Sequence, residues 1–240
     1  MTDTYRSELT DADMQRVEKM LGVTFTDRAV LQSALTHRSY LNEHREADWP
    51  HNERLEFLGD AVLELVITDF LYRKYPDKPE GELTAVRAAL VNTVSLSEAA
   101  GTLGVNEYLL MSRGEAKDSG RARQYILANT FEAIIGALYI DQGYDAAKRF
   151  IGDQLFAKTE RIVEHRLWQD PKSRFQELAQ ERESVTPVYE TLSQSGPDHD
   201  RTFVIGVFLR QEKIAEGSGR SKQEAEQAAA EAAVEARGWL

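Results

Sequence analysis

The hydrophobic positions divide the chain into two parts near residue 168. Up to that point, apolar residues recur at the three- and four-residue spacing of helices, and alternating β-branched residues are scarce. The pattern predicts a short helix from Asp11 to Met20, ended by Gly22, and a second helix capped by Asp27. Residues 1–168 are therefore predicted to be all-helical.

Two long segments of this first part are too apolar to be surface helices. Residues 52–74 and 125–140 carry apolar side chains on much more than one helical face, which predicts central, mostly buried helices. Between them, Pro79 opens a further helix whose apolar positions continue to Leu96, and residues 112–123 are typical of a polar loop. The expected core is thus formed by two long helices.

The second part, residues 169–240, has a mixed pattern. Asp170 as cap and Pro171 in the first turn mark a helix start, and Ser221 with Glu224 predicts a capping box at the start of the last helix. The predicted elements are a helix over 171–182, strands over 187–192, 202–209 and 213–216, and an alanine-rich helix over 221–237. Alanines at one face of this last helix would let it lie closely on a sheet. The predicted order is α-β-β-β-α.

Composition and charge limit the function classes. The 240 residues include no cysteine, which excludes disulfides and thiolate metal sites and fits a reducing cytoplasm. No apolar run is long enough to span a bilayer, so we expect a cytoplasmic protein that makes no membrane contact. The net charge of −11 argues against a polyanionic partner unless basic residues are grouped locally.

The stretch HNERLEFLGD, residues 51–60, carries carboxylates at Glu53, Glu56 and Asp60. Offsets of three and four residues place them along one stripe of a helix, where they repel one another. Such a stripe is most often a solvated face. Here the helix is predicted to be buried nearly all round, and an unpaired buried charge is costly, which strengthens the case for a bound cation without deciding it. The second buried helix also carries an acid, Glu132.

These motifs identify a family by resemblance. HNERLEFLGDAVL resembles the signature of the ribonuclease III family, and ALTHRSY at 34–40 and ILANTFEAIIGALYID at 126–141 are similar to the rest of its pattern. The resemblance extends from about residue 11 to the end and matches the bacterial form. It implies a multidomain chain: an all-α endonuclease domain over 1–168, followed by an α+β double-stranded-RNA-binding domain over 169–240.

The resemblance also implies a catalytic site. Carried over residue by residue, Glu56, Asp60 and Glu132 are catalytic and hold Mg²⁺, with Mn²⁺ as a possible substitute and Asn129 as the fourth metal ligand. Hard oxygen ligands around Mg²⁺ suit phosphodiester hydrolysis by a metal-bound water. Most members of the family have Asp where this chain has Asn129, so we expect weaker metal affinity without loss of activity.

Other positions receive secondary roles from the resemblance. Glu53 and Glu80 match acidic positions near the active valley, although Glu80 is equally well explained as a charge that favours a helix N-terminus. Phe57 and Leu58 lie in the segment that would join two copies of the chain into a homodimer, although Phe57 could simply belong to the core. Glu64 has no family role to carry over, and we expect it to be solvated or to support the site.

The second part is expected to bind RNA duplexes by shape, through minor-groove hydroxyls and phosphates. The implied contacts are Gln176 and Glu177 in one minor groove, Pro197 and His199 at the tip of a loop in another, and Arg220, Ser221, Lys222 and Gln223 on phosphates. From residue 170 onward there are 13 acids and 9 bases, so binding depends on their placement. We expect moderate, salt-sensitive affinity.

The sequence therefore predicts an endoribonuclease that cuts double-stranded RNA with a divalent metal, leaving 5′-phosphate and 3′-hydroxyl ends. Its substrates would be ribosomal RNA precursors and other structured transcripts, including messenger RNAs. The alternative is a catalytically weak or inactive duplex-RNA-binding protein on the same fold. Retention of Glu56, Asp60 and Glu132 favours the enzyme, and Asn129 is the only feature that favours the alternative.

Overall fold

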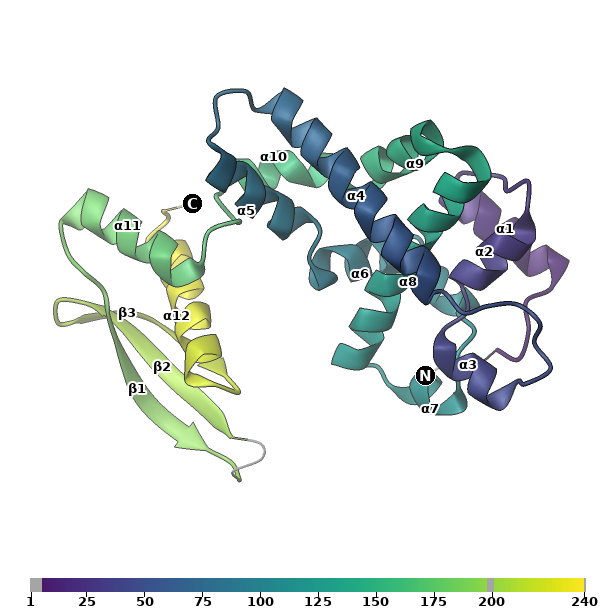
Figure 1. Ribbon diagram of the computed structural model, residues 1–240. Coiled ribbons are helices and arrows are strands. Elements are labelled where there is room, and N and C mark those ends of the chain that lie inside the picture. Colours follow the sequence, from purple (N-terminus) through teal and green to yellow (C-terminus); the bar gives the residue numbers. More distant parts are fainter. Residues whose placement is uncertain (1–5, 198–200, 240) are drawn as a thin grey trace. The chain divides into compact units, whose positions relative to one another are not determined.

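The computed structural model of the chain describes residues 6–197 and 201–239 and divides into two compact units, residues 1–160 and 161–240 (Figure 1). Each unit is described by itself. The domain boundary predicted from the sequence, after residue 168, lies slightly later and stays a prediction.

The first unit is built from helices. They are α1 (Asp11–Leu21), α2 (Arg28–Ala34), α3 (Arg38–Glu43), α4 (Glu53–Lys74), α5 (Glu80–Leu90), α6 (Thr93–Thr102), α7 (Arg113–Lys117), α8 (Arg121–Gln142), α9 (Tyr144–Ile151) and α10 (Ala157–Glu164), with a short 3₁₀ turn at Val105–Tyr108 and a π-helical turn at Gly152–Phe156. The predicted all-helical class is confirmed.

The helix ends follow local sequence signals. The Thr10 hydroxyl and the Asp13 carboxylate form a capping box at the start of α1, and Gly22 ends this helix with a φ of +69°, a conformation that glycine adopts without strain. Asp27 accepts from the backbone N–H of Ala29 at 2.9 Å and caps α2. These predicted starts and stops are confirmed.

Helices α4 and α8 form the centre of the unit, with the other helices around them (Figure 1). Phe131, Ile134 and Leu138 of α8 are fully buried, as predicted. Helix α4 differs from the prediction, because one of its faces is open. Phe57 and Tyr72 on that face are 81% and 72% exposed. Apolar spacing predicts that a face is covered, but none of the residues that the structure describes covers this one.

Two further details of the first unit differ from the sequence prediction. The helix expected from Pro79 to Leu96 is two helices, because the Asn92 side chain accepts from the backbone N–H of Ser95 at 2.9 Å and starts α6. The polar loop expected over 112–123 contains α7 and the first residues of α8. In both places local capping overrides the continuous hydrophobic or polar pattern.

The second unit packs two helices on one face of a three-stranded antiparallel sheet (Figure 1). Its elements are α11 (Pro171–Glu183), β1 (Val188–Ser195), β2 (Thr202–Leu209), β3 (Glu212–Gly219) and α12 (Lys222–Ala236), and the strand order is β1-β2-β3. Phe175, Val207 and Trp239 lie in its core. The predicted α-β-β-β-α order is confirmed.

Helix α12 lies very closely on β3. A Cβ at Gly217 would overlap the backbone of Ala229, which agrees with the predicted alanine face. The capping box predicted before α12 is only half correct. Ser221 accepts from the backbone N–H of Glu224 at 3.1 Å, but the Glu224 carboxylate accepts from the N–H of Arg220 at 2.9 Å, one residue before the cap.

Membrane insertion by a helix is not supported. Among the described residues, every helix is too short or too polar to cross a bilayer.

Candidate active site

The candidate site depends on how closely α4 and α8 approach each other. A Cβ at Gly59 would overlap the carbonyl group of Glu132, and a Cβ at Gly136 would overlap the carbonyl oxygen of Leu55. The two helices therefore touch backbone to backbone at these glycines. This contact brings the acidic stripe of α4 beside the one half-buried acid in the middle of α8, Glu132.

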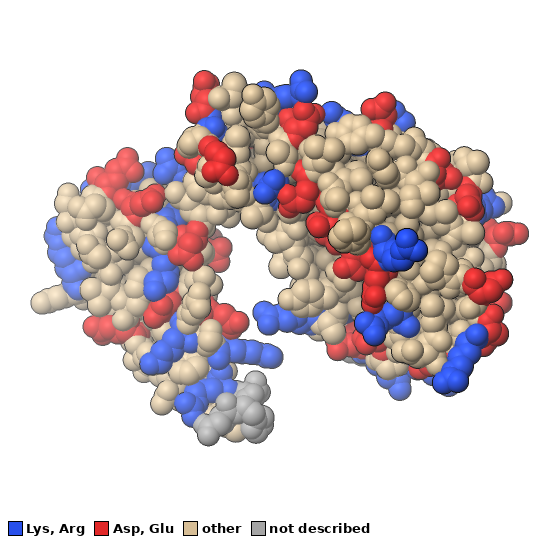
Figure 2. Space-filling view, viewed as in Figure 1, with Lys and Arg blue, Asp and Glu red and all other residues tan. Residues whose placement is uncertain are grey.

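Three carboxylates converge at this contact. Acidic side chains gather along α4 on the surface of the unit (Figure 2). Burial, together with the nearby charges of Asp60 and Glu56, raises the pKa of Glu132 to about 7. Burial and the charges of Glu53 and Asp60 also raise the pKa of Glu56. The charges of the neighbouring carboxylates thus lie close enough to oppose the ionisation of Glu56 and Glu132.

Asn129 belongs to the same group of side chains. It is half-buried on α8, one turn before Glu132, and hydrogen bonding by its side chain acts against the rise in the pKa of Glu56. The structure therefore brings together all four residues that the sequence assigns to the metal: Glu56, Asp60, Asn129 and Glu132. Their roles stay predictions.

The donor set fits a hard divalent cation by its chemistry. Carboxylate and amide oxygens are the ligands that Mg²⁺ prefers, and no described Lys or Arg lowers the pKa of Glu56 or Glu132. Within residues 6–197 and 201–239, however, no three His, Asp or Glu side chains are already arranged to hold an ion.

The other predicted acids have partners outside this group. Glu53 lies 3.2 Å from Arg38 in an exposed ion pair, although its charge still acts on Glu56. Glu80 accepts from the Thr84 hydroxyl at 3.0 Å and is one of the residues that line a hollow of about 440 Å³ beside α4 and α5. This contact fits the simpler explanation of Glu80, a charge in the first turn of a helix.

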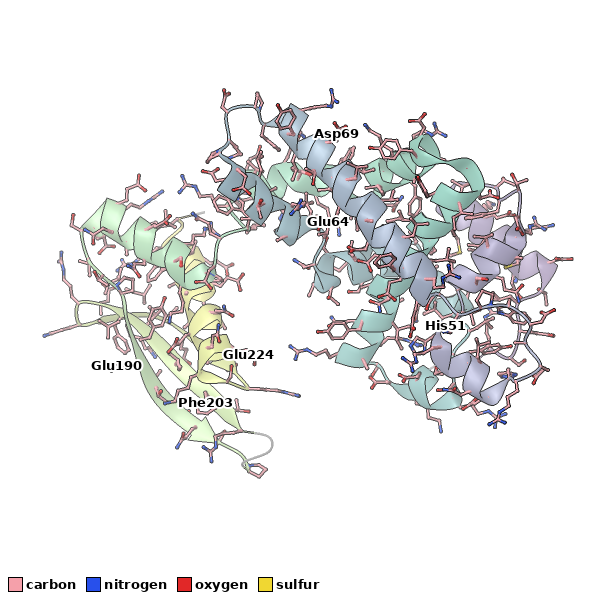
Figure 3. The ribbon with its side chains drawn as sticks, in the orientation of Figure 1. His51, Glu64, Asp69, Glu190, Phe203 and Glu224 are labelled. Carbon is pink, nitrogen blue, oxygen red and sulfur yellow. The ribbon has the colours of Figure 1, made fainter. Side chains whose placement is uncertain are left out.

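Glu64, for which the sequence suggested no role, is half-buried on α4 and lies 3.1 Å from Arg87 of α5 (Figure 3). The Arg87 guanidinium also donates to the Thr68 hydroxyl at 2.9 Å. Glu64 therefore links two helices of the unit.

Phe57 and Leu58 lie on α4 next to the candidate ligand Glu56. Phe57 is not a core residue, since 81% of it is exposed, whereas Leu58 is half-buried. Leu65 and Tyr72 follow Phe57 at helical spacing and are 58% and 72% exposed. We call Phe57, Leu65 and Tyr72 the open face of α4. A row of large exposed apolar side chains is typical of a protein contact.

The predicted RNA contacts of the second unit are exposed where the structure describes them. Gln176 and Glu177 lie on α11, Pro197 follows β1, and Arg220, Ser221, Lys222 and Gln223 lead into α12. His199 lies outside the described residues. Gly219 at the end of β3 pairs with Phe203 near the start of β2, so the residues before α12 lie at the same end of the sheet as the β1–β2 connection.

Comparison with known proteins agrees with this architecture. The sequence model of the Ribonuclease-III-like family matches residues 27–159, and that of the double-stranded RNA binding motif matches residues 171–236. The chain belongs to the ribonuclease III family. Membership makes it a nuclease, and therefore a hydrolase, with a helical nuclease domain followed by a double-stranded-RNA-binding domain.

Two curated relatives align with nearly the whole chain. Ribonuclease 3 of Geobacillus thermodenitrificans is 46% identical over 225 residues, which cover 93% of this chain and 91% of the relative. Ribonuclease 3 of Bdellovibrio bacteriovorus is 43% identical over 226 residues, covering 94% and 96%. The solved nuclease domain of ribonuclease III from Campylobacter jejuni is 39% identical, with a TM-score of 0.53, and covers 59% of this chain and 97% of that one.

Sequence reasoning missed two residues on which this ribonuclease III site depends. Gly59 and Gly136 carry no reactive group, yet they set the distance between the acid-bearing helices. The available signal was weak but present: each is a single glycine inside a long helix of bulky residues, a position where glycine costs stability unless close packing requires it.

Proposed function

We propose that this member of the ribonuclease III family hydrolyses phosphodiester bonds in double-stranded RNA with a divalent metal, and leaves 5′-phosphate and 3′-hydroxyl ends. The observation that carries the proposal is the convergence of Glu56, Asp60 and Glu132 from α4 and α8, with the pKa of Glu132 raised to about 7. A strongly perturbed carboxylate such as Glu132, with other acids beside it, is typical of functional sites.

In the proposed mechanism, Glu56, Asp60 and Glu132 hold Mg²⁺, or Mn²⁺ as a substitute, and Asn129 is the fourth member of the set. Such an ion supplies an activated water and stabilises charge on the attacked phosphate. The protein contributes rigid placement: the contact at Gly59 and Gly136 fixes the helices, so that the carboxylates need only rotate. Glu132 must lose its proton to bind a cation, which ties metal affinity to pH.

The second unit would hold the RNA duplex. Arg220 and Lys222 are exposed at the start of α12, where backbone N–H groups and cations together suit phosphates. The surrounding acids leave few phosphate contacts available, so the affinity should be moderate and should fall with salt by a slope that reflects this small number of contacts. We propose ribosomal RNA precursors and other structured transcripts as substrates, and the cytoplasm as the location.

We further propose that two copies assemble through the open face of α4. A homodimer with two-fold symmetry would present two sites to the two strands of a duplex. The open face supplies an apolar surface of the kind that such an interface buries. In the Campylobacter jejuni relative, flexibility is described in a region of the nuclease domain involved in dimer formation.

The variant Phe57→Glu is expected to be monomeric where the parent chain is a dimer, because a carboxylate would replace the most exposed apolar side chain of the open face. Sedimentation velocity measures the mass of both. Val94→Glu is the matched control, since Val94 is a 52% exposed apolar residue on a different helix, α6, and should leave the parent's mass unchanged. A Phe57→Glu protein with the mass of two copies would contradict the assignment.

Cleavage of an end-labelled RNA duplex by the full chain tests the proposed activity. We expect cutting in Mg²⁺ and in Mn²⁺, no cutting in excess EDTA, and recovery when the metal is returned. A kinase reaction on the products distinguishes the ends, because only a fragment treated with phosphatase should accept label at its 5′ end. Cutting that continues in EDTA would contradict metal-dependent hydrolysis.

Asn129 supports a second candidate, a duplex-binding protein with little catalysis. An amide brings no negative charge to the metal, so the affinity for Mg²⁺ should be lower than with a carboxylate. If the parent chain binds the duplex and cuts it in neither metal, whereas Asn129→Asp cuts, this second candidate is correct.

A further inference from the structure

We infer that Gln169 is a positioning residue, through which the second unit selects RNA over duplexes that lack 2′-hydroxyl groups. Its side-chain amide donates a hydrogen bond to the carboxylate of Glu177, and the two atoms lie 3.1 Å apart. Glu177 is one of the predicted RNA contacts. The inference therefore deepens the proposed function and rests on it.

The first support is the chemistry of Glu177. It is an exposed acid on α11, the helix predicted to enter a minor groove. An ionised carboxylate can only accept hydrogen bonds. It repels phosphates, which carry the same sign of charge, whereas the 2′-hydroxyl of ribose can donate to it. Glu177 therefore favours RNA only if its carboxylate is held toward the sugar hydroxyls and away from the phosphates.

The second support is that the backbone of Gln169 is fixed. Its N–H donates to the carbonyl of Arg166 at 3.0 Å, and the next residue, Asp170, caps α11 by accepting from the N–H of Ser173 at 3.0 Å. The Gln227 side chain of α12 also donates to the Asp170 carboxylate, at 3.1 Å. The residues immediately before α11 are thus attached to both helices of the second unit.

The third support is the orientation of the two side chains. Gln169 is half-buried, and its oxygen Oε1 is shielded from solvent and has no hydrogen-bond partner among the described residues. The other end of the amide, Nε2, meets Glu177. A helical glutamate leans toward the N-terminus of its helix, which brings the Glu177 carboxylate back toward Gln169.

This contact fixes Glu177 without using up its capacity to bind RNA. A carboxylate accepts at about four positions, so one bond from Gln169 leaves others for a 2′-hydroxyl. An exposed glutamate otherwise loses side-chain freedom when it meets its ligand, which costs free energy of binding. Gln169 restricts that freedom before the duplex arrives, so RNA binding should be tighter with it than without it.

Binding of duplexes by the full chain in EDTA tests the inference without any cleavage. Fluorescence anisotropy gives the affinity for an RNA duplex and for the same duplex with 2′-fluoro groups, which keep the A-form but cannot donate a hydrogen bond. Gln169→Ala is expected to weaken binding of the RNA duplex about threefold and to leave binding of the fluoro duplex unchanged. An equal loss with both duplexes would show a purely structural residue and overturn the inference.

Two further variants separate the hydrogen bond from packing. Gln169→Met keeps the length of the side chain but removes the donor, and should show the same threefold loss with the RNA duplex. In a Glu177→Ala background, Gln169→Ala should have almost no effect, because the acceptor is already absent. Gln211→Ala is the matched control, since Gln211 is an exposed amide between β2 and β3 and should bind both duplexes like the parent.

The other outcomes have distinct meanings. If Gln169→Met binds the RNA duplex like the parent, or if the loss from Gln169→Ala persists without Glu177, the inference is overturned. A Glu177→Ala chain that binds RNA like the parent also overturns it, and leaves the proposed metal-dependent cleavage untouched. A chain that shows the expected coupling but cuts RNA in neither Mg²⁺ nor Mn²⁺ contradicts the proposed function alone.

Discussion

Glu132→Gln is expected to abolish duplex cleavage while it makes the metal-free protein more stable at pH 8. Removal of one of three ligand carboxylates should slow cutting by about 10³-fold or more, equivalent to about 4 kcal/mol of transition-state stabilisation. Stability should move the other way, because glutamine fills nearly the same space without adding to the charge of Glu56 and Asp60.

The pH dependence has a defined sign. The pKa of Glu132 is about 7 in the folded chain, compared with about 4.5 for an unconstrained glutamate. Because the folded state holds this proton more tightly, the stability that it contributes is complete below pH 4.5 and is lost as the pH rises through 7. Glu132→Gln should therefore match the parent at low pH and exceed it by about 2 kcal/mol at pH 8.

Urea unfolding at several pH values in EDTA measures this difference in the free energy of unfolding. In Mg²⁺ the difference between variant and parent should be smaller, because only the parent is stabilised by binding the ion. Glu107→Gln is the control, since Glu107 is exposed and should change neither stability nor cutting. A Glu132→Gln variant that is less stable than the parent at pH 8 without metal would mean that the carboxylates do not repel one another as the structure implies.

Gly59→Ala is expected to destabilise the nuclease domain by roughly 3 kcal/mol or more. Alanine is the better helix former by about 1 kcal/mol, so helix propensity alone predicts the opposite sign. The added Cβ would overlap the carbonyl of Glu132, and relief of that overlap requires α4 and α8 to separate along their whole contact. Cleavage should fall as well, because separation moves Glu56 and Asp60 away from Glu132.

Gly101→Ala is the matched control for this substitution. Gly101 also lies within a helix, α6, but a Cβ there meets nothing within 4 Å. It should stabilise the chain by about 0.5–1 kcal/mol in the same urea titration. If Gly59→Ala and Gly101→Ala shift the midpoint of urea unfolding in the same direction, the close approach of α4 and α8 does not require glycine at position 59.

The sequence was most informative where local signals act alone. The caps at Asp27 and Asp170 and the helix end at Gly22 depend on a few neighbouring residues, and the helices begin and end close to where these signals predict. The helix break at Asn92 was not predicted, because the apolar spacing continues through it. The spacing indicated one long helix, whereas the Asn92 side chain caps a new one.

Contacts between distant segments were less predictable. The resemblance to the ribonuclease III family named the candidate acids, but nothing in their spacing gives the backbone contact between α4 and α8 that brings Glu132 near Glu56 and Asp60. That contact depends on how the two helices pack. Its only sign in the sequence is one glycine inside each long helix, and the role of these glycines was not predicted. For Phe57 the sequence left two interpretations open, a contact between two copies of the chain or the core, and its 81% exposure excludes only the core.

The contact between α4 and α8 also bears on how this protein can change over evolution. At Gly59 and Gly136 the spacing between the helices is set by main-chain atoms, which are the same in every sequence. Exchanges among the leucines and isoleucines of the core can therefore accumulate and alter stability without moving the carboxylates relative to one another. Core residues can thus change while the carboxylates keep their relative positions, provided that these two glycines remain.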